Sequence, residues 1–274
     1  MKRLILIAAG VLFAMNSTYA WGILGHTTVA KIAENNLTPK AKEELAKYFG
    51  KQSIVFYATY PDYYRAEWLV DYGFDPIDGK RVSVYPHTFE VDKDFKPFRG
   101  FNDNGRYVKN CVHFIDEYAK ELRDARKDMT DSTIMQRVIM LVHLVGDMHC
   151  PQHIQYNPED MSIGKYKVRF DNRNVKYHTF WDDEVFTRRN PFSFSDTALL
   201  LDTWSDERIA ATVAGEPYDW AEESARLSYP VHAYKEGAEL KRVPYLNEFT
   251  PLAEDQIRRA GYRLAKLLND IFGR

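Results

Sequence analysis

The sequence predicts an all-α fold, a single, mainly helical domain with one small β-hairpin. Most of the chain after residue 20 divides into segments whose apolar residues recur at helical spacing, and residues 133–141 are a clear example. Only residues 165–170 alternate as a strand does, and residues 171–174 can supply the turn after it. The sequence has no internal repeats and no linker-like stretch. We therefore expect one domain over residues 21–274, a length that can bury a substantial core.

Several helix boundaries can be predicted from local sequence signals. Thr38 followed by Pro39 is a typical helix start, with a capping side chain and then proline at the first helical position. Pro251 suits the first turn of the last helix in the same way. Residues 107–126 and 131–148 are interpreted as two antiparallel helices with a short polar link. The expected helical segments are residues 27–35, 40–49, 107–126, 131–148, 195–213, 218–228 and 250–272.

The first 20 residues have the features of a secretory signal peptide. Lys2 and Arg3 give a basic start, an apolar run follows, and the small residue Ala20 precedes Trp21. The apolar run is shorter than the roughly 20 residues that a membrane-spanning helix needs. We therefore expect cleavage after Ala20, a secreted or periplasmic protein, and no membrane association.

Charge excludes one common class of nucleic-acid-binding protein. The formal net charge is -2, and no run of lysine and arginine forms a basic patch. A site for phosphate would therefore need positive charge from another source, such as metal ions.

The two cysteines, Cys111 and Cys150, could form one disulfide or remain free thiols. Cys111 lies near the start of one predicted helix and Cys150 near the end of its antiparallel partner, so we expect them to be neighbours joined by a disulfide. The alternative is two buried thiols.

Histidine and aspartate recur at helical spacing. His143 and Asp147 project from one face of a helix that Pro151 should end, and His153 then turns back toward them. His178 and Asp182 repeat the four-residue spacing. Imidazole and carboxylate groups that converge in this way can bind zinc. Taken alone, each pair could also be a buried side-chain hydrogen bond.

Together these residues resemble the S1/P1 nuclease family, the zinc-dependent single-strand nucleases of fungi, plants and bacteria. The resemblance extends from Trp21 to about Asp182, with a weaker helical tail, and its motifs agree in order and approximate spacing. The motifs are Trp21-Gly22-Ile23-Leu24-Gly25-His26, Asp62-Tyr63-Tyr64-Arg65, Pro86-His87, His143-Leu144-Val145-Gly146-Asp147, Pro151-Gln152-His153 and His178-Thr179-Phe180-Trp181-Asp182.

The resemblance implies a phospholipase C/P1 nuclease-like fold with three zinc ions per chain. One zinc would be bound by Asp62, His87, His143 and Asp147. A second would be bound by His153, His178 and Asp182. The third would be bound by the amino group and carbonyl oxygen of Trp21, by His26, and by Asp147 as a bridge.

The resemblance also implies the reaction. Single-stranded DNA and RNA would be hydrolysed to products with a 5′-phosphate, and 3′-nucleotides would be further substrates. Asp62 would orient the attacking water, and Arg65 would stabilise the charge of the transition state with its fork-shaped guanidinium. We expect a monomer that acts on nucleic acid and nucleotides.

Some residues depart from the family pattern, and other functions stay open. Ser162 to Gly164 replace the family's Gly-Gly-Asn, so an active-site asparagine is missing. Thr88 stands where fungal relatives have an aromatic residue, and Cys150 and Gln152 replace the usual Gln and Leu. A zinc-dependent phospholipase C is the first alternative, although that family ends its last motif in Glu rather than Asp182. A protein that retains the ligands but has little turnover is the second.

Overall fold

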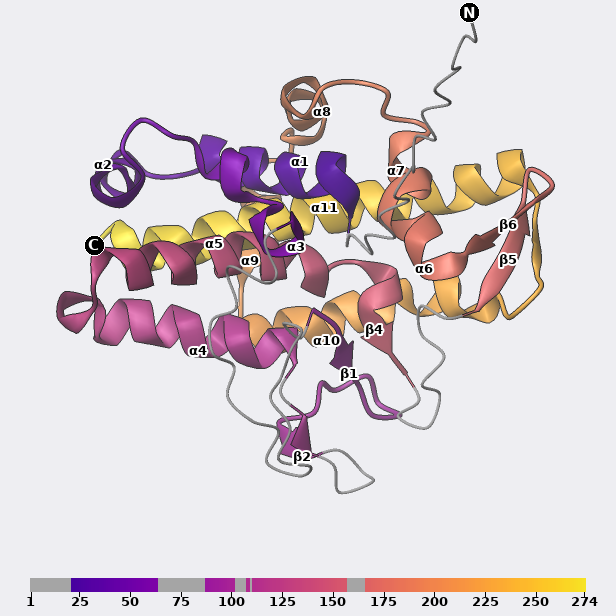
Figure 1. The fold of residues 1–274 in the computed structure, drawn as a ribbon, viewed down its shortest axis with the longest axis horizontal. Helices are drawn as coiled ribbons and strands as arrows, with labels where there is room; N and C mark the ends of the chain where they lie inside the picture. The colour runs from indigo at the N-terminus through magenta and orange to yellow at the C-terminus, as the bar shows by residue number, and fades with distance from the viewer. Residues whose placement is uncertain (1–20, 64–86, 102–106, 109, 157–165) are drawn as a thin grey trace, which may run out of the picture.

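Helix α5 (Asp131–Met148) lies at the centre of the fold, and every residue from Val138 to Met148 is buried. It begins where Thr130 accepts a hydrogen bond on its side chain from the backbone N–H of Thr133 at 3.2 Å. The C-terminal half of α5 is apolar around most of its circumference, as expected of a helix enclosed by others. The helices α4 (Cys111–Asp124), α1 (Gly22–Asn35) and α11 (Arg242–Phe272) pack against it (Figure 1).

The computed structural model describes residues 21–63, 87–101, 107–108, 110–156 and 166–274. The predicted signal peptide lies outside these residues. Among the described helices, none combines the length and the apolar character that crossing a membrane requires.

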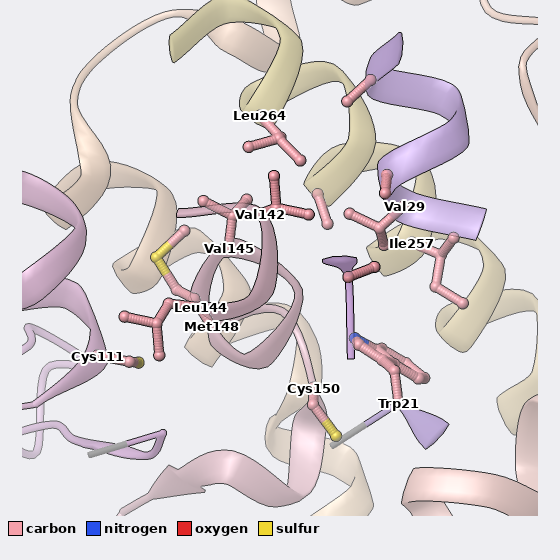
Figure 2. Packing of buried hydrophobic residues seen from close by; sticks show 14 of the residues in the cluster. Trp21, Val29, Cys111, Val142, Leu144, Val145, Met148, Cys150, Ile257 and Leu264 are labelled. Atoms are coloured by element: carbon pink, nitrogen blue, oxygen red, sulfur yellow. The ribbon is translucent and has the colours of Figure 1, made fainter. Parts of the chain in front are cut away.

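Helices α1 and α11 pack closely along their lengths. Gly261 of α11 permits this approach, because a Cβ atom at this position would lie 2.6 Å from Cβ of Ile32. The apolar core continues between these helices and α5, and Figure 2 shows Val142 of α5 and Leu264 of α11 within it. The C-terminal half of the chain therefore fixes where α1, and the residues at its start, lie relative to α5.

Several predicted helix boundaries were wrong. Helix α1 begins at Gly22 and not at residue 27, and α4 begins at Cys111, after the capping residue Asn110, while Tyr107 and Val108 form a strand instead. Helix α11 begins at Arg242, so Pro251 lies inside the helix and not in its first turn. The helix extends before the proline because Tyr245 and Phe249, four residues apart, are both buried. The predicted helix over residues 195–213 is divided into α8 (Phe194–Leu201) and α9 (Asp206–Val213).

The remaining helical elements are mostly short. Helix α2 (Pro39–Phe49) starts as predicted, with the Thr38 hydroxyl accepting a hydrogen bond from the N–H of Ala41 at 3.1 Å. The others are η1 (Ile54–Tyr57), α3 (Tyr60–Tyr63), η2 (Arg126–Asp128), η3 (Pro151–His153), α6 (Tyr177–Thr179), η4 (Phe180–Glu184), α7 (Val185–Thr187), α10 (Pro217–Ser228) and η5 (Tyr229–Ala233).

The predicted hairpin is confirmed. Strand β5 (Lys167–Phe170) pairs antiparallel with β6 (Arg173–Lys176), and Val168 faces Val175. Asp171 and Asn172 both have positive φ, as a two-residue hairpin turn of type I′ requires. Strand β7 (Glu239–Leu240) adds a parallel edge to β5.

Two further strand pairs are only two residues long. Strand β1 (Phe89–Glu90) lies parallel to β4 (Ile154–Gln155), and β2 (Gly100–Phe101) lies antiparallel to β3 (Tyr107–Val108). These small sheets leave the fold mainly helical, and the prediction of the fold class is confirmed. The pairing of β1 with β4 brings His87, two residues before β1, close to His153, which directly precedes β4.

Candidate metal centre

The centre is built on the last two turns of α5. His143 and Asp147 project from one face of this helix, with Nε2 of the imidazole 3.3 Å from Oδ2 of the carboxylate, and both side chains are fully buried. The Nδ1–H of His143 donates a hydrogen bond of 2.8 Å to the carbonyl oxygen of Ala58. This bond fixes the tautomer, so that the lone pair of Nε2 points toward the carboxylates.

Asp147 is shared among three histidine rings. Its Oδ1 lies 3.5 Å from Nε2 of His26 and 3.5 Å from Nδ1 of His153, while its Oδ2 faces His143. One carboxylate therefore connects residues from α1, α5 and η3. This arrangement suits a carboxylate that bridges metal ions.

Helix α1 brings His26 against α5 at a glycine. The ring of His26 stacks on that of His143, with the centroids 4.1 Å apart and the planes 12° from parallel. A Cβ atom at Gly146 would lie 2.7 Å from Nδ1 of His26, so only glycine leaves space for the ring. Asp62 of α3 approaches from the other side, with Oδ1 3.8 Å from Nε2 of His143. We call His26, Asp62, His143 and Asp147 the Asp147 group.

His153, His178 and Asp182 form a second group, here called the Asp182 group. Nε2 of His178 is 3.4 Å from Oδ2 of Asp182, and Nε2 of His153 is 3.7 Å from its Oδ1. The Nδ1–H of His178 donates to the carbonyl oxygen of Gln152 at 3.2 Å. Asp182 lies in the π-helix η4, a type of helix that is rare and often found at functional sites.

His87 lies with the second group in this structure. Its ring centroid is 4.9 Å from that of His153 and 6.3 Å from that of His178, and ligand nitrogens of all three lie within 4.8 Å of one another. The resemblance implies that His87 shares an ion with Asp62, His143 and Asp147. The parallel pairing of β1 with β4 accounts for its position next to His153.

Burial changes the protonation of these groups in a direction that suits metal binding. Loss of solvation lowers the pKa of His26 to about 4, against a smaller opposite effect of Asp62. Burial and the neighbouring His87 lower the pKa of His178 to about 4 as well. The imidazoles are therefore neutral at pH 7, with lone pairs available. Burial and the charges of Asp183 and Asp147 raise the pKa of Asp182, and a cation among these carboxylates would offset that repulsion.

Several of these polar atoms lack a hydrogen bond. Within the described part of the chain, both ring nitrogens of His26, both of His153, and Oδ2 of Asp182 are buried and make none. Such atoms are costly to bury unless another partner satisfies them. Nitrogen and carboxylate donors of this kind are the usual protein ligands of zinc, and the residues therefore fit a metal ion.

The comparison with known families gives one decisive match. A family model described as S1/P1 Nuclease matches residues 21–273. The chain belongs to the S1/P1 nuclease family. This membership places it among the nucleases, hydrolases that cleave phosphodiester bonds.

Individual relatives of the S1/P1 family match over nearly the whole chain. Nuclease S1 of Aspergillus oryzae is 25% identical, over 98% of this chain and 98% of its own. Nuclease P1 of Penicillium citrinum is 24% identical, over 92% of this chain and 98% of its own. Endonuclease 1 of Arabidopsis thaliana is 23% identical, over 98% of this chain and 93% of its own.

The expected disulfide of this S1/P1 family member is not formed. Cys111 and Cys150, the two cysteines of the chain, are buried free thiols. Figure 2 shows the two side chains well apart, with the end of α5 between them. Cys150 follows the last turn of α5, and its thiol donates a hydrogen bond to Oδ1 of Asp182 at 3.8 Å. The prediction failed because helix ends alone do not define the direction in which side chains project.

Other predicted positions are placed as follows. Trp21 is fully buried at the start of α1. Arg65 and the segment from Ser162 to Gly164 lie outside the described residues. The sequence prediction missed Gly146 and Cys150 as parts of the site. One signal in the sequence indicated Cys150: it replaces the usual Gln directly beside a ligand motif.

Replacing Gly146 with Ala should damage the metal centre while favouring the helix. Alanine improves helix propensity by about 1 kcal/mol, but its Cβ would displace the ring of His26. We expect at least about a tenfold loss of nuclease activity and a lower metal content, measured by elemental analysis. Gly50→Ala is the control, because a Cβ atom there would meet no atom within 4 Å, and the strain of its positive φ should lower only the unfolding temperature at full metal content. Full metal content and activity in Gly146→Ala would contradict this role.

The metal ions should remain bound in mildly acidic solution. An ordinary histidine with a pKa of 6.5 would take up a proton below that pH and release its metal, whereas His26 and His178 have pKa values of about 4. Protons should therefore compete for these two imidazoles only as the pH approaches about 4, whereas Asp182, whose pKa is raised, takes up a proton at a higher pH when no cation is bound. Metal content measured after dialysis over this range tests the expectation. Release with a midpoint close to pH 6.5 would contradict it.

Proposed function

We propose that this chain is a zinc-dependent endonuclease that hydrolyses single-stranded DNA and RNA to products with a 5′-phosphate and also acts on 3′-nucleotides. The observation that carries the proposal is the position of Asp147, whose carboxylate faces His26, His143 and His153 at 3.3 to 3.5 Å. This geometry supports a centre in which closely spaced ions share one ligand. The family membership supports the reaction class.

Nine residues would hold three zinc ions. They are Trp21, His26, Asp62, His87, His143, Asp147, His153, His178 and Asp182. When bound, the ions would supply positive charge for the anionic phosphodiester and would lower the pKa of a bound water. The ions would thus provide the attraction for an anionic substrate that a chain of net charge -2 without a basic patch otherwise lacks.

The chain's own residues would orient the reactants. Asp62 would accept a hydrogen bond from the attacking water and so direct an oxygen lone pair at phosphorus. Arg65, three residues later, would donate to the phosphate oxygens as charge develops on them. The carbonyl oxygens of Ala58 and Gln152 hold the rings of His143 and His178 in one tautomer each. Fixed rings cost no reorganisation during the reaction.

We further propose that residues 1–20 are a signal peptide, that Trp21 becomes the amino terminus, and that the monomeric product is secreted or periplasmic. The sequence of residues 1–20 supports the cleavage site. A new terminus at Trp21 would also place an amino group one and a half helical turns before His26.

The test compares three substrates for the mature protein. We expect rapid cleavage of single-stranded DNA, slow cleavage of the same sequence as a duplex, and none of phosphatidylcholine. End-labelling should place the phosphate on the 5′ end, chelation should abolish cleavage, and added zinc should restore it. Release of the phosphatidylcholine headgroup would favour a phospholipase C. Inactivity toward all three substrates at full zinc content would favour a binding protein.

A further inference from the structure

Cys150 lies beside the Asp182 group, but it is not one of the nine residues proposed above as metal ligands. The residue is fully buried between α5 and η3, and its sulfur is 3.8 Å from Oδ1 of Asp182. Its sulfur, a ring nitrogen of His153 and a carboxylate oxygen of Asp182 all lie within 4.8 Å of one another. Thiolate, imidazole and carboxylate are the three common zinc ligands of proteins.

A second observation points to a ligand at this place. Both ring nitrogens of His153 and Oδ2 of Asp182 are fully buried and make no hydrogen bond among the described residues. They belong to the same cluster as the thiol. A buried thiol alone would be inert packing, but beside unsatisfied donor atoms it completes a donor set.

The distances fit a common ion. In a tetrahedral zinc site, bonds of about 2.0 Å to nitrogen or oxygen and 2.3 Å to sulfur separate the donor atoms by about 3.3 to 3.5 Å. Here the sulfur lies 3.8 Å from Oδ1 of Asp182, Nε2 of His153 lies 3.7 Å from the same oxygen, and Nε2 of His178 lies 3.4 Å from Oδ2. Each of these three distances lies within a few tenths of an ångström of that range.

We propose that Cys150 is a thiolate ligand of the ion bound by His153, His178 and Asp182, an inference that rests on the proposed metal centre. As the ion binds, the thiol releases its proton to solvent and one metal–sulfur bond forms. Two neutral imidazoles, one carboxylate and one thiolate carry two negative charges, which neutralise one divalent cation. The set of four also closes the tetrahedral coordination sphere with protein atoms.

This ligand would make the second ion different from the others. The donor sets assigned to the other two ions contain no sulfur, and soft thiolate ligands favour zinc. The ion of the Asp182 group should therefore be the last to leave during chelation. His87 is half-buried beside the same histidines and is the competing fourth ligand, and the experiment separates the two by the presence of sulfur.

Cobalt substitution provides a readout that does not depend on activity. We compare the wild-type protein with Cys150→Ser, Cys150→Gln and the matched control Cys111→Ser, which also removes a buried thiol. Wild type and Cys111→Ser, loaded with Co²⁺, should show the near-ultraviolet charge-transfer absorption of a cobalt–thiolate bond, and both Cys150 variants should lack it. With zinc, X-ray absorption should show sulfur at about 2.3 Å from the metal only in the first two proteins. Affinity for the most tightly held ion should fall at least about tenfold in the Cys150 variants.

The results distinguish two failures. Metal bound by the wild type without any sulfur signal, or the same signal in Cys150→Ser, would overturn the role of Cys150 and leave the metal centre intact. A wild-type protein that binds no divalent metal would overturn both proposals. Two different substitutions at Cys150 control for misfolding. Glutamine is the usual residue of the family at this position, so we expect Cys150→Gln to fold.

Discussion

Asp147→Asn should abolish nearly all cleavage of single-stranded DNA and loosen two metal ions per chain. The carboxylate faces three histidines at 3.3 to 3.5 Å, so in the proposed centre its charge would serve more than one ion. The amide keeps the shape but loses the negative charge and one acceptor oxygen. Loss of a residue that only supports a metal ligand lowers metal affinity or activity by about 10- to 100-fold. For loss of a ligand itself we therefore expect the cleavage rate to fall at least about a hundredfold. Steady-state cleavage and elemental analysis of the same sample measure both effects.

The control for this variant is Asp116→Asn on α4. That carboxylate forms an exposed pair with Lys120 in an i, i+4 arrangement, and pairs of this kind contribute little. It should keep full activity and full metal content. Near-normal turnover with a full complement of ions in Asp147→Asn would refute the bridging role.

An extra Met-Gly before Trp21 should remove about one metal ion per chain and most of the activity. An amine has a lone pair for a metal, whereas the amide nitrogen that the extension creates has none. The start of α1 packs closely against η4, where a Cβ atom at Gly22 would clash with Oδ1 of Asp183. The extended and the correctly processed proteins are compared by elemental analysis and by cleavage of single-stranded DNA.

The matched control carries the same Met-Gly after Arg274, which is exposed at the other end of the chain. It should behave as the unmodified protein. If the extension before Trp21 leaves metal content and activity unchanged, the amino terminus is not a ligand.

Local sequence signals predicted much of the fold because they act over a few residues. Thr38 and Pro39 start α2 where expected, and Asp171 and Asn172 form the hairpin turn. The break between α8 and α9 combines a local helix cap at Ser205 with a contact to a distant residue. The carboxylate of Asp202 accepts hydrogen bonds from the side-chain amide of Asn36 at 3.0 and 3.1 Å, a contact between residues 166 positions apart. No window of sequence around Asp202 contains that information.

In the metal centre, too, local spacing was predictable and contacts between distant residues were not. Helical spacing indicated that His143 and Asp147, and likewise His178 and Asp182, share a face, and each pair lies within 3.4 Å in the structure. Spacing could not show that His87 joins His153, because two-residue strands leave no detectable pattern. It also could not show the direction of Cys150, which depends on how the chain leaves α5.

The centre draws its residues from distant parts of the chain, from His26 in α1 to Asp182 in η4. A polypeptide that is still being synthesised cannot assemble such a site until residue 182 has left the ribosome and has packed against α5. Because metal affinity arises with folding, the unfinished chain lacks the geometry that would hold metal ions. For a nuclease, this order of events keeps the phosphodiester-cleaving site incomplete until synthesis has passed residue 182.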